Sequence, residues 1–143
     1  MTNSKIAFKG FKAITIIAIL WNIMGAYSFY YHTNMPVEEI AKLPIAEQAL
    51  YQNIPQWKII AFFIATIGGL LGSVLLFLKK KLSIIVLILS LIGVFVSFYY
   101  DFFKTNLIEV YGNGSVILPI TIALIAIFLV WYARKADKAG FLS

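Results

Sequence analysis

The chain has 143 residues, of which 62% are hydrophobic and only 13% are charged. A typical soluble domain carries about 25% charged residues, so this composition excludes an ordinary soluble protein and indicates a single membrane-embedded domain over residues 1–143. The chain has no cysteine, which excludes disulfides, thiolate metal sites and a cysteine nucleophile, and its net charge is +6.

Four apolar runs of about 18 to 22 residues dominate the chain, and at about 1.5 Å rise per residue each can cross a roughly 30 Å hydrocarbon core. None contains Asp, Glu or Arg, and the only lysine, Lys58, stands at an entrance. We expect the first run to be a retained helix, since no small-residue cleavage site follows it. The sequence therefore predicts an all-α membrane protein with four transmembrane helices in an up-down bundle. The expected spans are residues 13–31, 57–78, 82–100 and 116–133.

The first run carries one strongly polar residue, Asn22, near its middle. An unpaired amide in hydrocarbon costs several kcal/mol, so Asn22 requires either Ser90 or Ser97 across the bundle, or a water-filled cavity. Two interpretations of Asn22 follow: a clamp between two helices and a contact to a solute.

The first outer loop, residues 32–56, is predicted to contain a short amphipathic helical segment. Pro36 begins it, with Thr33 or Asn34 as the expected cap and two glutamates in the first turn. Apolar residues recur at helical spacing on both sides of Pro44, which indicates two short amphipathic helices. The segment is either a connector on the membrane surface or a lid over an outward-facing pocket.

Small residues mark one face of the second run, in Gly68-x-x-x-Gly72 and Gly69-x-x-x-Ser73. Helices in lipid associate through close contact, so this spacing predicts a helix-packing face. That face lies either at the centre of the bundle or in an oligomer interface. The link of three lysines at residues 79–81 is so short that the second and third helices must be antiparallel neighbours.

The first and third runs end in matching aromatic segments, Ser28-Phe29-Tyr30-Tyr31-His32 and Ser97-Phe98-Tyr99-Tyr100-Asp101. Aromatic residues gather at membrane interfaces whatever the function, so an aromatic belt is one interpretation. The other is a small aromatic-walled site in which His32 and Asp101 hydrogen-bond a polar ligand. One histidine and one carboxylate do not make a metal site, and we expect no metal or cofactor. The candidate ligand-binding residues are Asn22, Tyr31, His32, Tyr100 and Asp101.

The charges alternate with the spans. Nine basic residues and one acidic residue flank the spans on one side, against three basic and five acidic residues on the other. Lysine and arginine mark cytoplasmic flanks, so both termini are expected in the cytoplasm of a multi-pass protein. The basic residues fall in three separate segments beside apolar runs, so we expect the lipid bilayer as the partner and no nucleic acid. The basic group comprises Lys5, Lys9, Lys12, Lys79, Lys80, Lys81, Arg134, Lys135 and Lys138.

Short motifs spread over nearly the whole chain resemble a family of small bacterial four-helix integral membrane proteins. Its members commonly carry an automatic "sugar transporter" label, which implies the bacterial inner membrane and a solute but assigns no residue roles. The resemblance rests on Leu20-Trp21-Asn22-x-x-Gly25, Pro55-x-Trp57, Gly69-x-x-Gly72-x-x-x-Leu76, Ser90-Leu91, Trp131-Tyr132-Ala133-Arg134 and Gly140-x-Leu142.

Catalytic patterns are missing from the sequence: it has one histidine, no paired intramembrane carboxylates and no phosphate-binding glycine loop. We therefore expect no enzyme. One hypothesis is a protein that binds or translocates a small polar solute as a homo-oligomer. The alternative is a noncatalytic accessory subunit that packs against another membrane protein through the Gly68/Gly72 face.

Overall fold

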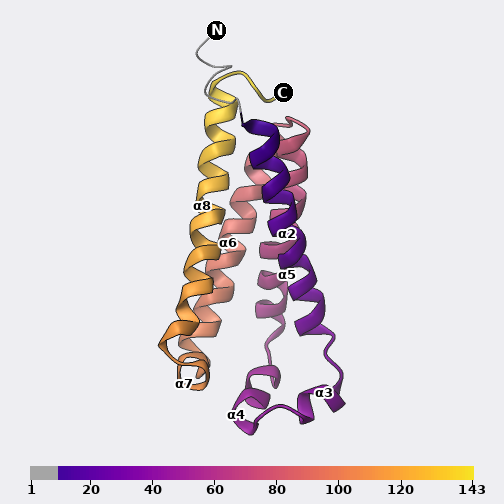
Figure 1. The fold of residues 1–143 in the computed structure, drawn as a ribbon, viewed down its shortest axis with the longest axis vertical. Coiled ribbons are helices and arrows are strands. Elements are labelled where there is room, and N and C mark those ends of the chain that lie inside the picture. The colour runs from indigo at the N-terminus through magenta and orange to yellow at the C-terminus, as the bar shows by residue number, and fades with distance from the viewer. Residues whose placement is uncertain (1–9) are drawn as a thin grey trace.

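The computed structural model describes residues 10–143, and most of that part is helical (Figure 1). The all-α prediction is confirmed, and each of the four long helices is long and apolar enough to cross a membrane, which fits a multi-pass membrane protein. The observed helices run a few residues beyond most of the expected spans, because polar residues continue a helix outside the hydrocarbon. The long helices are α2 (Phe11–Thr33), α5 (Gln56–Phe77), α6 (Leu82–Phe103) and α8 (Ile117–Lys138).

Short helices gather at one end of the bundle, which we call the loop end. They are α3 (Val37–Ala41), α4 (Ile45–Gln48), the 3-10 turn η1 (Ala49–Tyr51), α7 (Leu107–Tyr111) and the 3-10 turn η2 (Asn113–Val116). The other end holds the 79–81 link, the last turn of α8 and the C-terminus, and we call it the basic end (Figure 1). Lys5 and Lys9 lie outside the described residues.

The prediction of two short helices in the first loop is confirmed, but the predicted caps are wrong. Pro36 itself is the N-cap of α3 and makes no side-chain cap hydrogen bond. Helix α2 runs on to Thr33, so the side chains of Thr33 and Asn34 serve its end instead. The Thr33 hydroxyl donates to the Phe29 carbonyl at 2.7 Å, and the Asn34 amide donates to the Tyr30 carbonyl at 3.0 Å.

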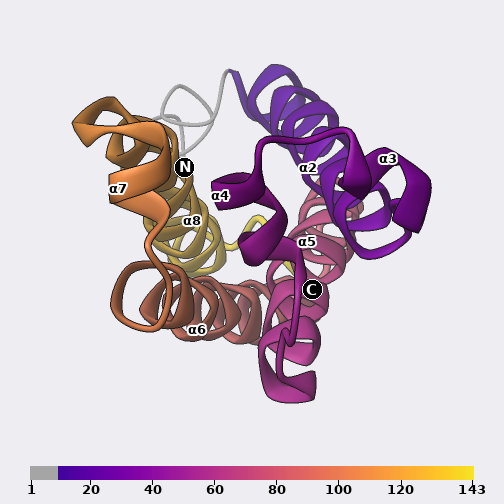
Figure 2. The ribbon, with the colours of Figure 1, turned by 90° about the horizontal axis from the view of Figure 1, so that it is seen from below.

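The helices pack as an incomplete ring. Helix α5 packs between α2 and α6, and α8 packs on α6, while α2 and α8 do not pack along their lengths. Figure 2 shows α2 and α8 on either side of the open part of this ring, with α4 beneath its middle. The three-lysine link makes α5 and α6 antiparallel neighbours, as predicted.

The glycine face of α5 lies inside the chain. A Cβ at Gly68 would come 3.3 Å from the Ser90 Cβ, and one at Gly72 would come 2.7 Å from the Leu87 side chain. A Cβ at Gly69 would overlap the Asn22 side chain of α2. Gly68, Gly69, Gly72 and Ser73 therefore bring α5 close to α2 and α6. The oligomer-interface interpretation of this face is not supported, because helices of the same chain already cover it.

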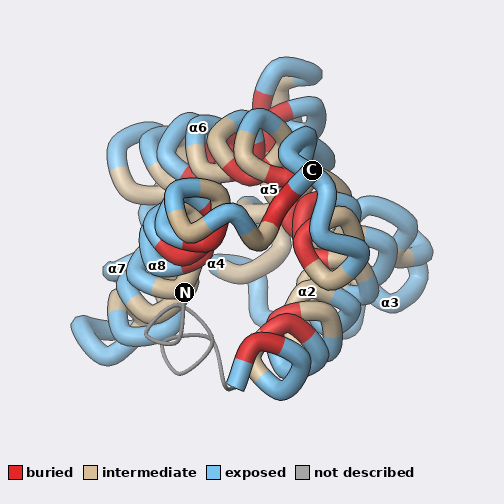
Figure 3. Tube along the Cα trace, turned by 90° about the horizontal axis from the view of Figure 1, so that it is seen from above, coloured by how far each residue is buried: buried red, intermediate tan, exposed pale blue. Residues whose placement is uncertain are grey.

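An apolar core closes the basic end. Phe11 of α2 stacks on Tyr132 of α8 with ring centroids 6.0 Å apart and also contacts Phe141 at 5.2 Å. The C-terminus pairs with the α5–α6 link, because the Ser143 N–H donates to the Lys79 carbonyl at 2.9 Å. Figure 3 shows buried segments on the inward faces of the helices. The core comprises Phe11, Ala18, Leu76, Leu87, Leu129, Tyr132, Ala133, Ala136 and Leu142.

Candidate functional site

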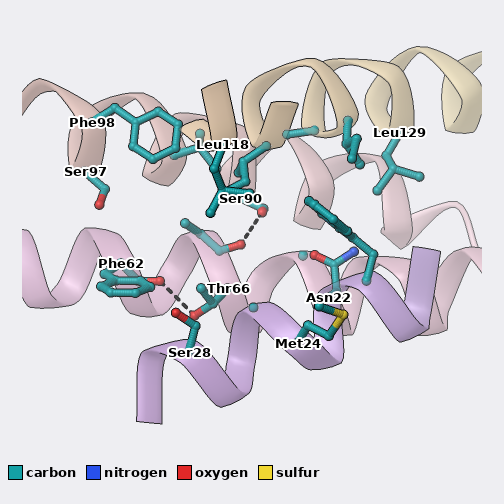
Figure 4. A pocket seen from close by; sticks show the side chains of 18 of the residues that line it. Asn22, Met24, Ser28, Phe62, Thr66, Ser90, Ser97, Phe98, Leu118 and Leu129 are labelled. Carbon is teal, nitrogen blue, oxygen red and sulfur yellow. Dashed lines mark hydrogen bonds between the residues drawn. The ribbon is translucent and has the colours of Figure 1, made fainter. Parts of the chain in front are cut away.

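A cavity of about 310 Å³ lies between all four long helices (Figure 4). Leu87 and Leu129 line its inner end and also belong to the core of the basic end. Met24 of α2 and Leu118 of α8 line it as well, and both are exposed, so the cavity reaches the surface where these two helices fail to pack. The cavity is thus closed toward the basic end and open on the side between α2 and α8.

An ion pair stands in the wall of the cavity nearest the loop end. The Lys58 ammonium lies 2.9 Å from the Asp101 carboxylate, and the two side chains are 8% and 28% exposed. The ammonium also donates to the Ser97 carbonyl at 3.3 Å and to the Ser97 hydroxyl. The Phe62 and Tyr100 rings flank it, with centroids 5.2 and 5.9 Å away. Because α5 and α6 are antiparallel, the first turn of one meets the last turns of the other and brings these charges together.

Asn22 forms a clamp, although with a different partner from those predicted. Its amide nitrogen donates to the Ser73 hydroxyl at 3.0 Å and to the Ala18 carbonyl at 2.8 Å. Ser90, one of the two predicted partners, instead donates its hydroxyl to the Ala65 carbonyl at 2.7 Å. The reason is the packing order, since α2 lies against α5 rather than α6. Asn22 also lines the cavity, so the structure combines the clamp with a position open to a ligand.

No hydrogen bond or ion pair joins His32 to Asp101, the two residues of the predicted aromatic-walled site. The His32 Nδ1 lies 3.1 Å from the Tyr51 hydroxyl, and Tyr31 contacts the His32 ring edge-on at 5.5 Å. Asp101 instead pairs with Lys58, which α5 places between the ends of α2 and α6. Tyr100 packs edge-on against Trp57 at 5.5 Å. Of the five candidate ligand-binding residues, Asn22 and Asp101 line the cavity, whereas Tyr31, His32 and Tyr100 do not.

Several cavity residues were not predicted from the sequence. Lys58 is the main omission, although a lone lysine in an apolar run and an aspartate at the matching end of the next run were a usable signal. Ser28 and Thr66 also line the cavity, and the Thr66 hydroxyl donates to the Phe62 carbonyl at 2.8 Å (Figure 4). Nothing in the spacing of these hydroxyl groups distinguishes a cavity wall from a packing seam.

Two tyrosines belong to the first and second loops at the loop end. The Tyr111 hydroxyl of α7 donates to the Glu47 carboxylate of α4 at 3.5 Å. Burial raises the pKa of Tyr111, and the negative charge of Glu47 raises it further. Burial also raises the pKa of Tyr51, the partner of His32. Both phenols therefore remain protonated through neutral pH, so each is able to donate a hydrogen bond.

Comparisons of the chain with family models, with curated proteins and with solved structures find no match. The resemblance to small bacterial four-helix membrane proteins therefore stays a prediction. Among residues 10–143, no group of three His, Asp or Glu side chains is placed to hold a metal ion. The cavity and its ion pair are the features from which a function can be inferred.

Proposed function

We propose that this membrane protein binds a small amphiphilic solute in the cavity between its four helices. The polar group of the solute binds beside Lys58 and Asp101, and its apolar body lies against α2 and α8. We place the protein in the bacterial inner membrane with the basic end in the cytoplasm, because nine of its twelve basic residues belong to that side. The cavity and the loop end then face outward.

The ion pair in the cavity wall carries this proposal. A pair of charges taken out of water gains little net stability, because desolvation offsets most of the attraction. Ionisable residues within transmembrane helices are accordingly rare and mark ligand or ion sites, and Lys58 and Asp101 lie in the first turn of α5 and the last turn of α6. Lys58 is almost fully buried and satisfied by Asp101 and Ser97, while the Asp101 Oδ1 oxygen makes no hydrogen bond with any described residue. A solute with one hydrogen-bond donor or cationic group fits this remaining oxygen.

The other polar groups of the cavity restrict the solute to one with few hydrogen bonds. The hydroxyls of Thr66 and Ser90 donate to backbone carbonyls, and both amide hydrogens of Asn22 are used within the chain. The Ser28 hydroxyl and the Asn22 Oδ1 oxygen remain without a hydrogen bond to a described residue. A sugar presents hydroxyl groups on all sides and would leave many of them unpaired against the apolar walls. The volume lies at the low end of the roughly 300–1,000 Å³ range of ligand pockets, which favours a small molecule. This inference departs from the "sugar transporter" label that the resemblance implied.

Binding needs only one chain, because residues of a single chain line the cavity on all sides except the opening between α2 and α8. Translocation requires more, since the core at the basic end blocks passage to the other side. We infer that an oligomer or another conformation is needed for movement across the membrane. The accessory-subunit alternative has lost its proposed docking surface, because α2 and α6 cover the Gly68/Gly72 face.

Ligand binding in lipid nanodiscs tests the proposal. Small amphiphilic amines, amino acids and sugars of similar size are added, and the melting temperature is measured for the wild type and for Asp101→Asn. We expect amphiphilic amines to raise the melting temperature of the wild type and to have a smaller effect on Asp101→Asn. Glu109→Gln, which removes a carboxylate elsewhere at the loop end, is the matched control and should behave as wild type. Stabilisation by sugars alone would contradict the proposed solute class.

The orientation has its own test. A reporter that is active only in the cytoplasm should be active when fused at Ser143. A periplasmic-type reporter should be active when fused near Gln48. Activity of a periplasmic-type reporter at Ser143 would reverse the assignment, and the cavity would then face the cytoplasm.

A further inference from the structure

A second concavity lies on the outside of the bundle, between α6 and α8 and toward the basic end. Its volume is about 470 Å³, and it shares no lining residue with the central cavity. Leu91 is its only contribution from α6, and every other lining residue belongs to α8. We call it the basic groove, and it is lined by Leu91, Ile127, Val130, Trp131, Arg134, Lys135 and Lys138.

The chemistry of the groove changes in order along α8. Ile127, Trp131 and Lys135 are spaced by four residues, so they lie along one face of the helix. The face is apolar toward the middle of the span, aromatic next and cationic at the helix end. A phospholipid has the same order of acyl chain, glycerol region and phosphate. Tryptophan favours the glycerol and headgroup level of a bilayer, which fits the position of Trp131.

The cations of the groove are uncompensated within the described part of the chain. Arg134, Lys135 and Lys138 are exposed, and none forms an ion pair with an acidic residue among residues 10–143. Asp137 is the nearest acidic residue in sequence, but its carboxylate lies 3.5 Å from the Lys81 ammonium on the α5–α6 link. The Lys135 ammonium lies 4.8 Å from the centre of the Trp131 ring, which places it over the aromatic part of the groove.

We propose that the basic groove binds an anionic phospholipid. Its phosphate contacts Arg134, Lys135 and Lys138, and one acyl chain lies against Ile127, Val130 and Leu91. An arginine fork pairs with two phosphate oxygens, and each further cation near the surface adds attraction for anionic lipid. A zwitterionic lipid supplies the same phosphate but adds an ammonium group, which the three cations repel. The charge of the groove therefore selects the anionic headgroup.

Lipid quenching of a single tryptophan tests this site in the full chain. The variant Trp21→Phe/Trp57→Phe leaves Trp131 as the only tryptophan. It is reconstituted into phosphatidylcholine vesicles that contain either brominated phosphatidylglycerol or brominated phosphatidylcholine. We expect brominated phosphatidylglycerol to occupy the site next to Trp131 roughly fivefold or more in preference to phosphatidylcholine. Equal quenching by the two lipids would overturn the proposal.

Matched charge removals locate the selectivity. Arg134→Gln/Lys135→Gln/Lys138→Gln should reduce the preference to near one. Lys12→Gln/Lys79→Gln/Lys80→Gln removes the same charge at the same end and should keep it. Loss of selectivity in both variants would show a general surface effect and would contradict a specific site.

Free phosphate distinguishes a lipid site from a simple anion site. Millimolar glycerol phosphate should leave the preference for brominated phosphatidylglycerol unchanged, because the acyl contacts are part of the binding. Abolition of the preference by glycerol phosphate would show that the groove takes a free phosphate rather than a lipid.

Discussion

At the basic end all four helices contribute to one apolar core, whereas at the loop end α2 and α8 separate and a buried ion pair stands in the wall between α5 and α6. The C-terminus ties the basic end together through Ser143 and the α5–α6 link. The loop end depends on contacts between polar side chains, such as Tyr111 with Glu47. The difference teaches that stability and ligand access are divided between the two ends of one small bundle.

The largest effect on stability is expected from truncating a buried side chain in the core of the basic end. Leu76 is fully buried, so Leu76→Ala should lower the free energy of unfolding by about 2–5 kcal/mol. Leu71→Ala on the same helix is the matched control, because Leu71 is 51% exposed and its truncation leaves no internal cavity. Unfolding in mixed detergent micelles measures both. Equal losses for the two variants would mean that the basic end is not the packed core.

The next largest effect on stability is expected at the close contact between α5 and α6. A Cβ at Gly93 would lie 2.8 Å from the Ala61 carbonyl and from the Ala65 nitrogen, so Gly93→Ala must force the two backbones apart. We expect it to lower the free energy of unfolding by about 1–3 kcal/mol. Gly114→Ala is the control, because a Cβ there meets nothing within 4 Å. The same unfolding assay applies, and a neutral Gly93→Ala would contradict the close approach of these helices.

The ion pair should show a smaller, directional effect. Lys58→Met leaves the Asp101 carboxylate without its cation and should lower the free energy of unfolding by about 1–2 kcal/mol, less than for a fully buried pair because Asp101 is partly exposed. Adding Asp101→Leu should restore part of that loss. Lys42→Met breaks an exposed pair with Glu39 of nearly the same length and should cost under about 0.5 kcal/mol. If Lys58→Met/Asp101→Leu is no more stable than Lys58→Met, the unpaired Asp101 carboxylate does not destabilise the single variant.

The smallest effect concerns pH at the loop end. The pKa values of Tyr51 and Tyr111 are raised in the folded chain above the ordinary value of 10.0. The unfolded chain therefore loses these protons first, so their contribution to stability is complete below about pH 10 and is lost as the pH rises through the folded pKa. Tyrosinate absorbance is measured against pH for the wild type and for Tyr51→Phe/Tyr111→Phe. The difference between the two curves is the titration of Tyr51 and Tyr111, which we expect at a higher pH than that of the other tyrosines. Ionisation of these two phenols at or below the ordinary pKa of tyrosine would contradict their burial.

Much of the fold could be predicted from the sequence, because apolar length and helical spacing are local properties. The four spans, the helical loop and the close packing of Gly68 and Gly72 all follow from such patterns. The capping prediction was wrong because the end of α2 depends on how far the helix continues past the apolar run. Thr33 and Asn34 therefore serve α2 rather than α3.

The candidate site was harder to predict, because it depends on the order in which the helices pack. Asn22 was identified from its cost in hydrocarbon, but its partner Ser73 follows from α2 lying on α5. Asp101 was chosen because it ends an aromatic segment that matches the one ending in His32. The antiparallel register of α5 and α6 instead pairs Asp101 with Lys58. A sequence shows which side chains need partners, and only the packing order shows which ones they find.

Cysteine accessibility at two adjacent residues tests most directly whether the loop-end half of the bundle holds a water-filled cavity. The chain has no cysteine, so Ser28→Cys and Tyr27→Cys each carry a single thiol. Ser28 lines the cavity, whereas Tyr27 is exposed on the outer surface of α2 and does not. A membrane-impermeant thiol reagent should modify Ser28→Cys roughly tenfold faster than Tyr27→Cys, because only a hydrated thiol ionises and reacts. Equal, slow modification of both would contradict a hydrated cavity.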